Sequence, residues 1–378
     1  MRIGIVTHPA YINYGGILQA YALQTTLEKL GHEVWKIEKP YVYPHMSKAH
    51  RVFSICKRVI IKCFFHQDVI IDIDAYACKK TKEAMQNTRK FAENHLNIKI
   101  SENMSQYRDF FDCLIAGSDQ VWRYYGNAAD LNYYYLDFAE DWNVKRIGYA
   151  VSFGNDTIDY PDNILTECKK LAAKFDMVTV REKSGVDVCK KYLHIDARQI
   201  LDPTMLLTLH EYTELFKSDN EGNETKTKDK KQLACYILDN NNEKQTVIAK
   251  VADNYGLSVK YISAQPEKDN EYFDWLVQPS VESWLQNISE AEYVVTDSFH
   301  GCVFSILFNK PFVAMVNKQR GEDRFVSLLS LFDLNERLVK GDNVEISKLH
   351  PIDWTIVNEK LKILREESLN YLNKYLQN

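Results

Sequence analysis

Short apolar runs alternate with stretches of helical spacing along most of the chain. The first apolar run, residues 2–8, leads into a glycine-containing loop. Apolar residues then recur at helical spacing, namely Leu18, Ala22, Leu23, Leu27 and Leu30. Gly31 ends this helix, as glycine commonly does, and residues 33–39 form the next strand. A strand, a helix and a strand at this spacing predict a βαβ unit, which implies a parallel sheet.

The same alternation continues on both sides of one polar interruption. Further strands are predicted in the first half at residues 110–117, 144–154, 175–182 and 199–207. Residues 217–231 are highly charged and contain no apolar anchor, so they mark a domain boundary. We therefore predict an α/β fold with two Rossmann-like domains facing a cleft, formed by residues 1–216 and 232–354. Residues 355–378 have a helical pattern, and this C-terminal helix can cross back to the first domain.

Composition, charge and cysteine content narrow the class of protein. A chain of 378 residues, 45% hydrophobic and 26% charged, is typical of a soluble protein with two domains. It has no apolar run long enough to span a membrane, and its first residues lack the order of a signal peptide, so we expect a cytoplasmic protein. The formal net charge of −5 argues against nucleic-acid binding. The eight cysteines are scattered without a CxxC pair, so we expect reduced thiols and no metal site.

Polar residues gather where ligands bind in open parallel sheets, just beyond the carboxyl ends of the strands. The loop after the first strand contains Asn13, Tyr14, Gly15 and Gly16. Glycines let a ligand approach the backbone, and the following helix N-terminus favours anions. The alternative is that the two glycines only allow a tight turn.

A second loop follows residues 110–117. Ser118 can open a loop there, Asp119 and Gln120 can bind the hydroxyls of a sugar, and Trp122 offers an apolar face for a sugar ring. The alternative is a capping aspartate beside a buried tryptophan.

Arg181 follows the strand at residues 175–180. An arginine at this point can bind the carboxylate or phosphate of a donor through two parallel hydrogen bonds. The alternative is an ion pair within the domain, with Glu182 or Asp202. Asp202 itself begins an Asp-Pro-Thr turn and can orient Arg181.

Residues 297–301, with the sequence DSFHG, connect an apolar strand to a helix. His300 lies near the helix N-terminus, and histidine is the side chain best suited to proton transfer near neutral pH. We interpret His300 as the catalytic acid or base and Asp297 as the group that orients it, with Ser298 beside them on the ligand side of the sheet. The alternative is a structural histidine.

The loop at residues 318–325 follows the neighbouring strand. Lys318, Arg320 and Arg324 surround Gly321 there and can bind a phosphate or carboxylate. The alternative, for at least one of these cations, is a solvated loop.

Together these motifs resemble the polysaccharide pyruvyl transferase family. The resemblance rests on NYGGILQAYAL from residue 13, GSDQVW at 117–122, YAVSFG at 149–154, VRE at 180–182, DPT at 202–204 and DSFHG at 297–301. Each motif alone is weak, but their order and spacing cover most of the chain from residue 1 to about residue 335.

The resemblance implies a fold similar to the GT-B class and transfer of pyruvate from phosphoenolpyruvate onto two hydroxyls of a sugar, forming a ketal. The implied acceptor is a nucleotide-linked or lipid-linked sugar, and no cofactor is implied. We expect the acceptor to bind at Asn13, Tyr14, Gly15, Gly16, Ser118, Asp119 and Gln120. We expect the donor to bind at Arg181, Arg320, Arg324, Ser298 and Gly301. The family's catalytic histidine matches His300, and its cleft arginine matches Arg181. Some members carry DRLHG where this chain has Ser298 and Phe299, so donor binding here must use other cations.

Two other functions fit the same residues. A glycosyltransferase that uses a nucleotide-sugar donor would need the same fold and cleft. A catalytically inactive glycan-binding protein would tolerate the missing DRLHG arginine.

Residues 46–67 mix basic and apolar side chains at helical spacing. A basic amphipathic helix can lie on an anionic bilayer, so we expect peripheral contact with the inner face of the cytoplasmic membrane. The alternative is a helix that covers the first sheet.

Overall fold

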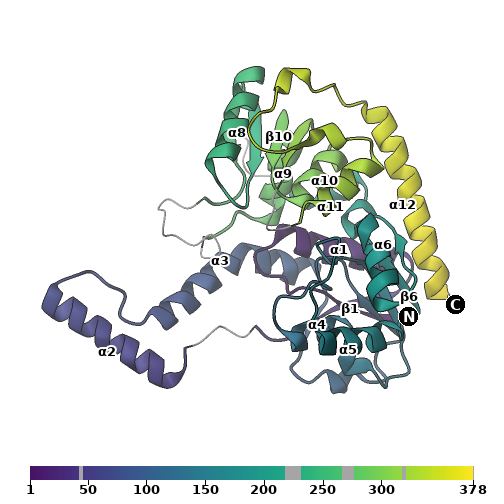
Figure 1. Cartoon of the computed structure of the whole chain (residues 1–378), viewed down its shortest axis with the longest axis horizontal. Coiled ribbons are helices and arrows are strands. Elements are labelled where there is room, and N and C mark those ends of the chain that lie inside the picture. The colour runs from purple at the N-terminus through teal and green to yellow at the C-terminus, as the bar shows by residue number, and fades with distance from the viewer. Residues whose placement is uncertain (42–45, 218–230, 266–275, 317–320, 378) are drawn as a thin grey trace.

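The computed structural model describes residues 1–41, 46–217, 231–265, 276–316 and 321–377. Within these residues the chain forms a parallel sheet of seven strands and a second parallel sheet of five (Figure 1). The predicted α/β architecture of two Rossmann-like domains is confirmed.

The first sheet has the strand order β3-β2-β1-β4-β5-β6-β7. Its strands are β1 (Arg2–Val6), β2 (Glu33–Glu38), β3 (Ile98–Ile100), β4 (Cys113–Ala116), β5 (Lys145–Val151), β6 (Met177–Val180) and β7 (Arg198–Gln199). The helices of this part are α1 (Tyr14–Lys29), α3 (Ile73–His95), α4 (Ala128–Tyr134), α5 (Asp162–Ala172) and α6 (Lys183–Val188). Every residue of β4 and β6 is buried, as expected of parallel strands covered on both faces. The strand order reverses between β1 and β4.

The second sheet has the strand order β12-β11-β10-β8-β9. Its strands are β8 (Gln232–Tyr236), β9 (Ser258–Tyr261), β10 (Tyr293–Thr296), β11 (Phe312–Met315) and β12 (Leu338–Val339). The helices of this part are α8 (Asn242–Tyr255), α9 (Val281–Glu290), α10 (Phe299–Leu307) and α11 (Asp323–Leu331). The strand order here reverses between β8 and β10, and such reversals are where open α/β sheets bind ligands.

Two details around the predicted domain boundary differ from expectation. The strand predicted at residues 199–207 is limited to β7, because Asp202 and Pro203 turn the chain into a short 3₁₀ helix. The predicted first domain includes residues 209–216, but the helix that they form, α7 (Leu209–Lys217), packs on the second domain, where the ring of Tyr212 lies edge-on to Phe304 at 5.0 Å. Most of the predicted linker, residues 218–230, lies outside the described residues.

The C-terminal helix α12 (Trp354–Gln377) runs from the second domain back along the first (Figure 1). Leu372 and Leu376 are buried in the same core cluster as Ile3 of β1. Arg365 donates hydrogen bonds to the carbonyl oxygen of Met205 at 2.7 Å and to that of Leu207 at 3.0 Å. The predicted crossing is confirmed, and it ties the two domains together.

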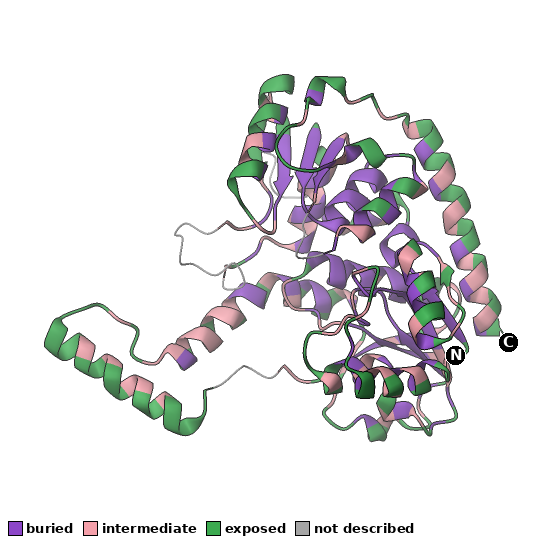
Figure 2. Ribbon diagram, in the orientation of Figure 1, coloured by how far each residue is buried: buried purple, intermediate pink, exposed green. Residues whose placement is uncertain are grey.

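The predicted basic helix is α2 (Lys48–Phe65), and it does not cover the first sheet. It packs beside the start of α3, and the two helices form an arm that projects from the body (Figure 1). No residue of α2 is buried (Figure 2). The alternative of a sheet-covering helix is therefore wrong. Among the described helices, none combines the length and the apolar character needed to cross a membrane.

Candidate active site

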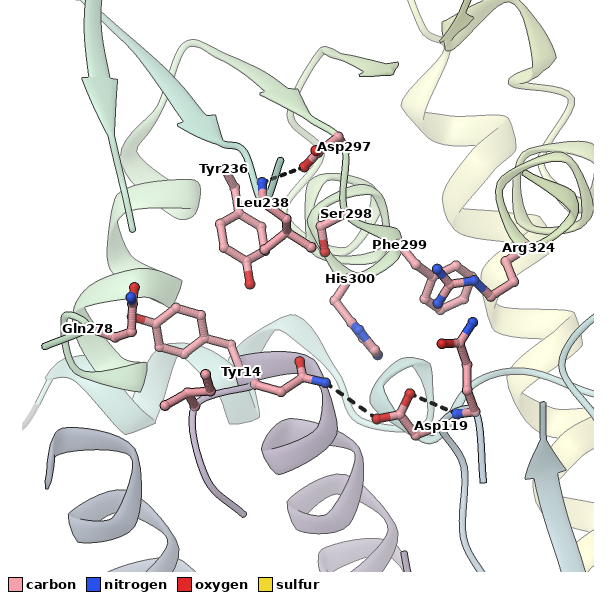
Figure 3. A pocket seen from close by; sticks show the side chains of 13 residues that line it. Tyr14, Asp119, Tyr236, Leu238, Gln278, Asp297, Ser298, Phe299, His300 and Arg324 are labelled. Carbon is pink, nitrogen blue, oxygen red and sulfur yellow. Dashed lines mark hydrogen bonds between the residues drawn. The ribbon is translucent and has the colours of Figure 1, made fainter. Parts of the chain in front are cut away.

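The loops at the two strand-order reversals enclose a cavity of about 160 Å³ (Figure 3). The first domain contributes the loops after β1 and β4, and the second contributes those after β8 and β10. The described residues that line the cavity are Ile12, Asn13, Tyr14, Asp119, Gln120, Tyr236, Leu238, Gln278, Asp297, Ser298, Phe299, His300 and Arg324. Most of the predicted site residues are therefore brought together in one place.

His300 is held between the two domains. It lies in the first turn of α10, where Ser298 Oγ caps the helix by accepting a hydrogen bond from the Gly301 N–H at 3.5 Å. The imidazole lies so close to α1 that a β-carbon at Gly15 would be 1.9 Å from Nδ1. Its Nε2 lies 3.8 Å from Asp202 Oδ2, an ion-pair distance that is too long for a hydrogen bond. The ring is buried, so packing from both domains fixes its position.

The prediction that Asp297 orients His300 is wrong. The buried Asp297 carboxylate turns toward the loop after β8, where it accepts hydrogen bonds from the N–H groups of Leu238 at 2.7 Å and Asp239 at 3.1 Å. It also pairs with Lys244 Nζ at 2.6 Å. Figure 3 shows the carboxylate pointing to Leu238 and away from the imidazole. Asp297 therefore braces the cavity wall, and the carboxylate nearest the imidazole comes from the first domain.

Arg181 is buried in an ion-pair network of the first domain and does not line the cavity. Its Nε donates to Glu182 Oε1 at 3.1 Å, and its Nη1 donates to Asp202 Oδ2 at 3.1 Å. Its Nη2 lies 3.8 Å from Asp119 Oδ1. The guanidinium also lies 4.6 Å from the ring centre of Phe299, which does line the cavity. The structure thus supports the intradomain ion pair rather than the prediction that Arg181 grips the donor.

Asp202 joins this network to the imidazole. Its Oδ2 accepts hydrogen bonds from Gln19 Nε2 at 2.5 Å and from Ser118 Oγ at 3.2 Å. Burial alone would raise the pKa of Asp202, but His300 and Arg181 hold it well below its ordinary value. Asp202 is therefore an anion that pairs with Arg181 and lies close to the His300 imidazole. Ser118, predicted to bind the acceptor, instead lies behind the cavity wall as part of this network.

Asp119 is a strained acid that faces the cavity. Its φ of 94° is in the left-handed region, which a non-glycine residue rarely adopts and which often marks functional sites. Its carboxylate accepts from the Gln120 N–H at 2.8 Å and from Asn13 Nδ2 at 3.4 Å. Burial would raise the pKa of Asp119, but His8 and Arg181 keep it below its ordinary value. Three predicted acceptor-binding residues therefore form one hydrogen-bonded wall.

Arg324 is a cation of the second domain that lines the cavity. It is the second residue of α11, and its guanidinium lies 5.8 Å from the ring centre of Phe299. Burial, with repulsion from Arg181, lowers the pKa of Arg324 to about 10, so the side chain is still charged at neutral pH. The other predicted donor-binding cations, Lys318 and Arg320, lie outside the described residues.

The model of the family described as polysaccharide pyruvyl transferase matches residues 13–319, a span that includes both halves of this cavity. The chain belongs to the polysaccharide pyruvyl transferase family. The resemblance based on the motifs is thereby confirmed. A search of curated proteins found no match to the chain.

A comparison with solved structures found similarities that cover most of this family member. UDP-GlcNAc 2-epimerase from Neisseria meningitidis bound to UDP-GlcNAc is 10% identical, with 99% of this chain and 93% of that chain covered and a TM-score of 0.46. Arabidopsis thaliana UGT89C1 complexed with UDP is 9% identical, with 98% and 95% covered and a TM-score of 0.45. E. coli ADP-heptose lps heptosyltransferase II is 12% identical, with 97% and 99% covered and a TM-score of 0.36. At such low TM-scores these likenesses say nothing of the reaction.

In this pyruvyl transferase family member, two predicted acceptor residues of the first loop serve the packing of the site. The hydroxyl of Tyr14 donates to the carbonyl oxygen of Pro279 at 2.7 Å, and its ring stacks on Trp284 at 5.2 Å. Tyr14 thus joins the domains and is also one of the residues that line the cavity. A β-carbon at Gly16 would lie 3.2 Å from Asp119 Oδ2, so this glycine allows the loop after β4 to approach α1.

Two residues of the motifs also have structural roles. Trp122 is buried and stacks on Tyr135 at 4.4 Å, so the alternative of a buried tryptophan is correct. Gly301, predicted at the donor, does not line the cavity. A β-carbon there would lie 2.1 Å from Thr296 Oγ1, so the glycine is required where α10 packs on β10.

Some cavity residues were missed by the sequence analysis. Tyr236 and Leu238 lie at the carboxyl end of β8, which is the same signal that identified the loop of His300. Gln278 offers no such signal. Its Oε1 accepts from the Ala264 N–H at 3.1 Å, a contact between loops that no local pattern predicts.

The Nε2 atom of His300 is buried on the cavity wall and has no hydrogen-bond partner among the described residues. Buried polar atoms are nearly always hydrogen-bonded, so this atom indicates a place where a ligand binds. Within the described part of the chain, no group of three or more His, Cys, Asp or Glu side chains is arranged to hold a metal ion.

Proposed function

We propose that this family member transfers pyruvate from phosphoenolpyruvate onto two hydroxyls of a sugar in a polysaccharide precursor, forming a ketal. The observation that carries the proposal is the position of His300. It is a buried histidine on the wall of a cavity between two domains, and its Nε2 has no hydrogen-bond partner among the described residues. A histidine placed in this way can transfer protons near neutral pH.

The donor is an anion with a carboxylate and a phosphate, so its site needs cations. Arg324 supplies one in the cavity wall, and the N-terminal turn of α11 favours negative charge at the same point. Arg181 stabilises the carboxylates behind the wall. We propose Arg320 as a second cation that contacts the donor, and this part of the proposal rests on the sequence alone.

The chemistry requires proton transfers and a change of bonds at one carbon. The methylene carbon of phosphoenolpyruvate takes a proton, and a sugar hydroxyl bonds to the adjacent carbon and loses its proton. The bond to phosphate then breaks, the second hydroxyl closes the ring, and its proton leaves with the phosphate. In this proposal His300 exchanges protons with the reacting groups, and the Asp202 carboxylate lies 3.8 Å from its Nε2. None of these steps is a redox step, so phosphoenolpyruvate is a co-substrate and we expect no cofactor.

The acceptor side of the cavity is the wall formed by Asn13, Asp119 and Gln120. Carboxylate and amide groups of this kind bind sugar hydroxyls through hydrogen bonds. We propose a nucleotide-linked or lipid-linked sugar as the acceptor, with the hydroxyl pair presented to His300.

The test is phosphate release from phosphoenolpyruvate in the presence of nucleotide-linked and lipid-linked sugars. Loss of a general acid or base costs about 10²–10⁴-fold in rate, so we expect this loss in His300→Ala. His210→Ala is a matched control because the His210 side chain is 76% exposed on α7. An unchanged rate in His300→Ala would refute the role of His300. Transfer of a sugar from a nucleotide-sugar donor, without phosphate release from phosphoenolpyruvate, would replace the proposal with glycosyl transfer.

A further inference from the structure

The arm presents one apolar face of α2 to solvent. Phe53 is 68% exposed and Phe64 is 78% exposed. The face consists of seven exposed residues at helical spacing, Val52, Phe53, Cys56, Val59, Ile60, Cys63 and Phe64. A contiguous exposed apolar surface of this kind marks a site of interaction. We refer to it as the α2 apolar face.

The opposite side of α2 is fastened to the polypeptide that leads into α3. Arg51 Nη2 pairs with Asp72 Oδ2 at 2.6 Å, and Arg58 Nη1 donates to the carbonyl oxygen of Ile70 at 3.0 Å. These contacts fix which side of α2 points outward, so the α2 apolar face is directed away from the protein.

Charge on α2 identifies the kind of partner. The helix carries five basic residues and no acidic one, in a chain whose net charge is −5. Lys48 and Lys57 are exposed and flank the α2 apolar face at the helical spacing. A helix with an apolar face, aromatic residues and flanking cations matches the interface of an anionic bilayer. A second copy of the chain fits poorly, because two such helices would bring cations together without an acid between them.

We propose that the α2 apolar face docks this protein on a bilayer that contains anionic lipids. The docking stands on α2 alone and does not depend on the proposed reaction. Further along α3, Asn87 Nδ2 donates to the carbonyl oxygen of Gln278, a residue that lines the cavity, at 2.7 Å. Between the start of α3 and Asn87 the helix is about 20 Å long. The arm would therefore connect the cavity wall to the bilayer surface through α3.

Two cysteines within the α2 apolar face allow a test on the native protein. Cys56 and Cys63 are exposed, whereas Cys78 on α3 is only partly exposed. We would measure the rate at which a water-soluble thiol reagent modifies each of them, by peptide mass spectrometry. Vesicles of phosphatidylglycerol and phosphatidylcholine should slow modification of Cys56 and Cys63 at least tenfold, and Cys78 serves as the internal reference.

A second measurement is sedimentation with the same vesicles. Each cation near an anionic surface contributes about a factor of five in binding, so Lys48→Glu with Lys57→Glu should weaken it by about 30-fold or more. The control has the same number of reversals at exposed positions on the first domain, Lys190→Glu with Lys191→Glu, and should bind as the native protein does.

The outcomes separate the possible partners. We call the Lys48→Glu, Lys57→Glu protein the α2 charge variant. The proposal is supported if anionic vesicles, but not neutral ones, slow the modification of Cys56 and Cys63, and if this effect is lost in the α2 charge variant. Equal binding of native protein and α2 charge variant would overturn it. A different result would make the α2 apolar face an interface between copies of the chain. In that case Cys56 and Cys63 would react slowly even without vesicles, and the protein would form dimers in solution that Phe53→Ser and Phe64→Ser dissociate. The α2 variants lie away from the cavity, so their rate of phosphate release with a water-soluble acceptor should equal that of the native protein. If the native protein itself releases no phosphate, the proposed reaction is wrong but the docking proposal is unaffected.

Discussion

Replacing Gly15 by alanine places a methyl group where the imidazole of His300 lies. The new β-carbon would be 1.9 Å from Nδ1 and 2.4 Å from Cε1 and Cγ. Ordinary contact begins at 3.4 Å, so the ring must move by about 1.5 Å or the domains must separate. A misplacement of about 1 Å at a reacting group can cost about 100-fold in rate. We therefore expect kcat/KM for phosphate release to fall at least about 100-fold in Gly15→Ala.

Gly16→Ala is the matched control, because it adds the same methyl group one position further along α1. Its β-carbon would lie 3.2 Å from Asp119 Oδ2 and 3.4 Å from Asn13 Nδ2, so shifts of a few tenths of an ångström suffice. We expect it to retain activity within about tenfold, since the His300 ring is not displaced. Overpacking costs about 1–3 kcal/mol, so the free energy of unfolding of both variants should be measured in urea. Native activity in a folded Gly15→Ala protein would refute the placement of His300 as the reacting group.

Three further predictions follow from buried charges and from α12. Asp297→Ala leaves the Lys244 cation unpaired in the interior, so the free energy of unfolding in urea should fall by about 3–5 kcal/mol, and a loss below 1 kcal/mol would contradict the bracing role. The pKa of Asp202 is lower in the folded protein than in the unfolded chain, where it is about 4. The Asp202 carboxylate therefore stabilises the folded protein above about pH 4, and this stabilisation is lost as the pH falls toward the folded pKa. Unfolding free energy measured from pH 6 to pH 3 should therefore fall less steeply in Asp202→Asn than in the native protein, and parallel curves would exclude this linkage. Arg365→Ala removes two hydrogen bonds from α12 to the first domain and should cost about 1.5–3 kcal/mol in thermal or urea unfolding, whereas no change would show that α12 docks through its apolar residues alone.

Much of the fold could be predicted from the sequence, because the spacing of apolar residues and the residues that end each strand or helix are local properties of the chain. Apolar runs ending in polar residues identified β1, β4 and β10, whose following loops line the cavity, and the run at β10 led directly to His300. The same signal is present at the end of β8, but it does not point to Tyr236, because a tyrosine there is also typical of an apolar strand.

The partners of the site residues could not be predicted in the same way. Asp297 is three positions from His300, yet its carboxylate faces the loop after β8, whereas Asp202 approaches the imidazole from the other domain. Which carboxylate meets the ring depends on how the domains pack, and that contact spans 98 positions of the chain. Arg181 shows the same limit. The sequence allowed it either to bind a ligand or to form an ion pair within the domain, and only the fold shows that three carboxylates surround it.

The central claim, that phosphoenolpyruvate binds in this cavity, is tested most directly by thermal and urea unfolding with and without phosphoenolpyruvate. Binding to the folded state at a hundred times the dissociation constant should stabilise the native protein by about 2.7 kcal/mol. The account predicts this stabilisation in the native protein and its loss in Arg324→Ala, each compared with its own ligand-free unfolding. Equal stabilisation of both proteins would place the donor elsewhere. No stabilisation by phosphoenolpyruvate, together with stabilisation by a nucleoside diphosphate, would contradict pyruvyl transfer.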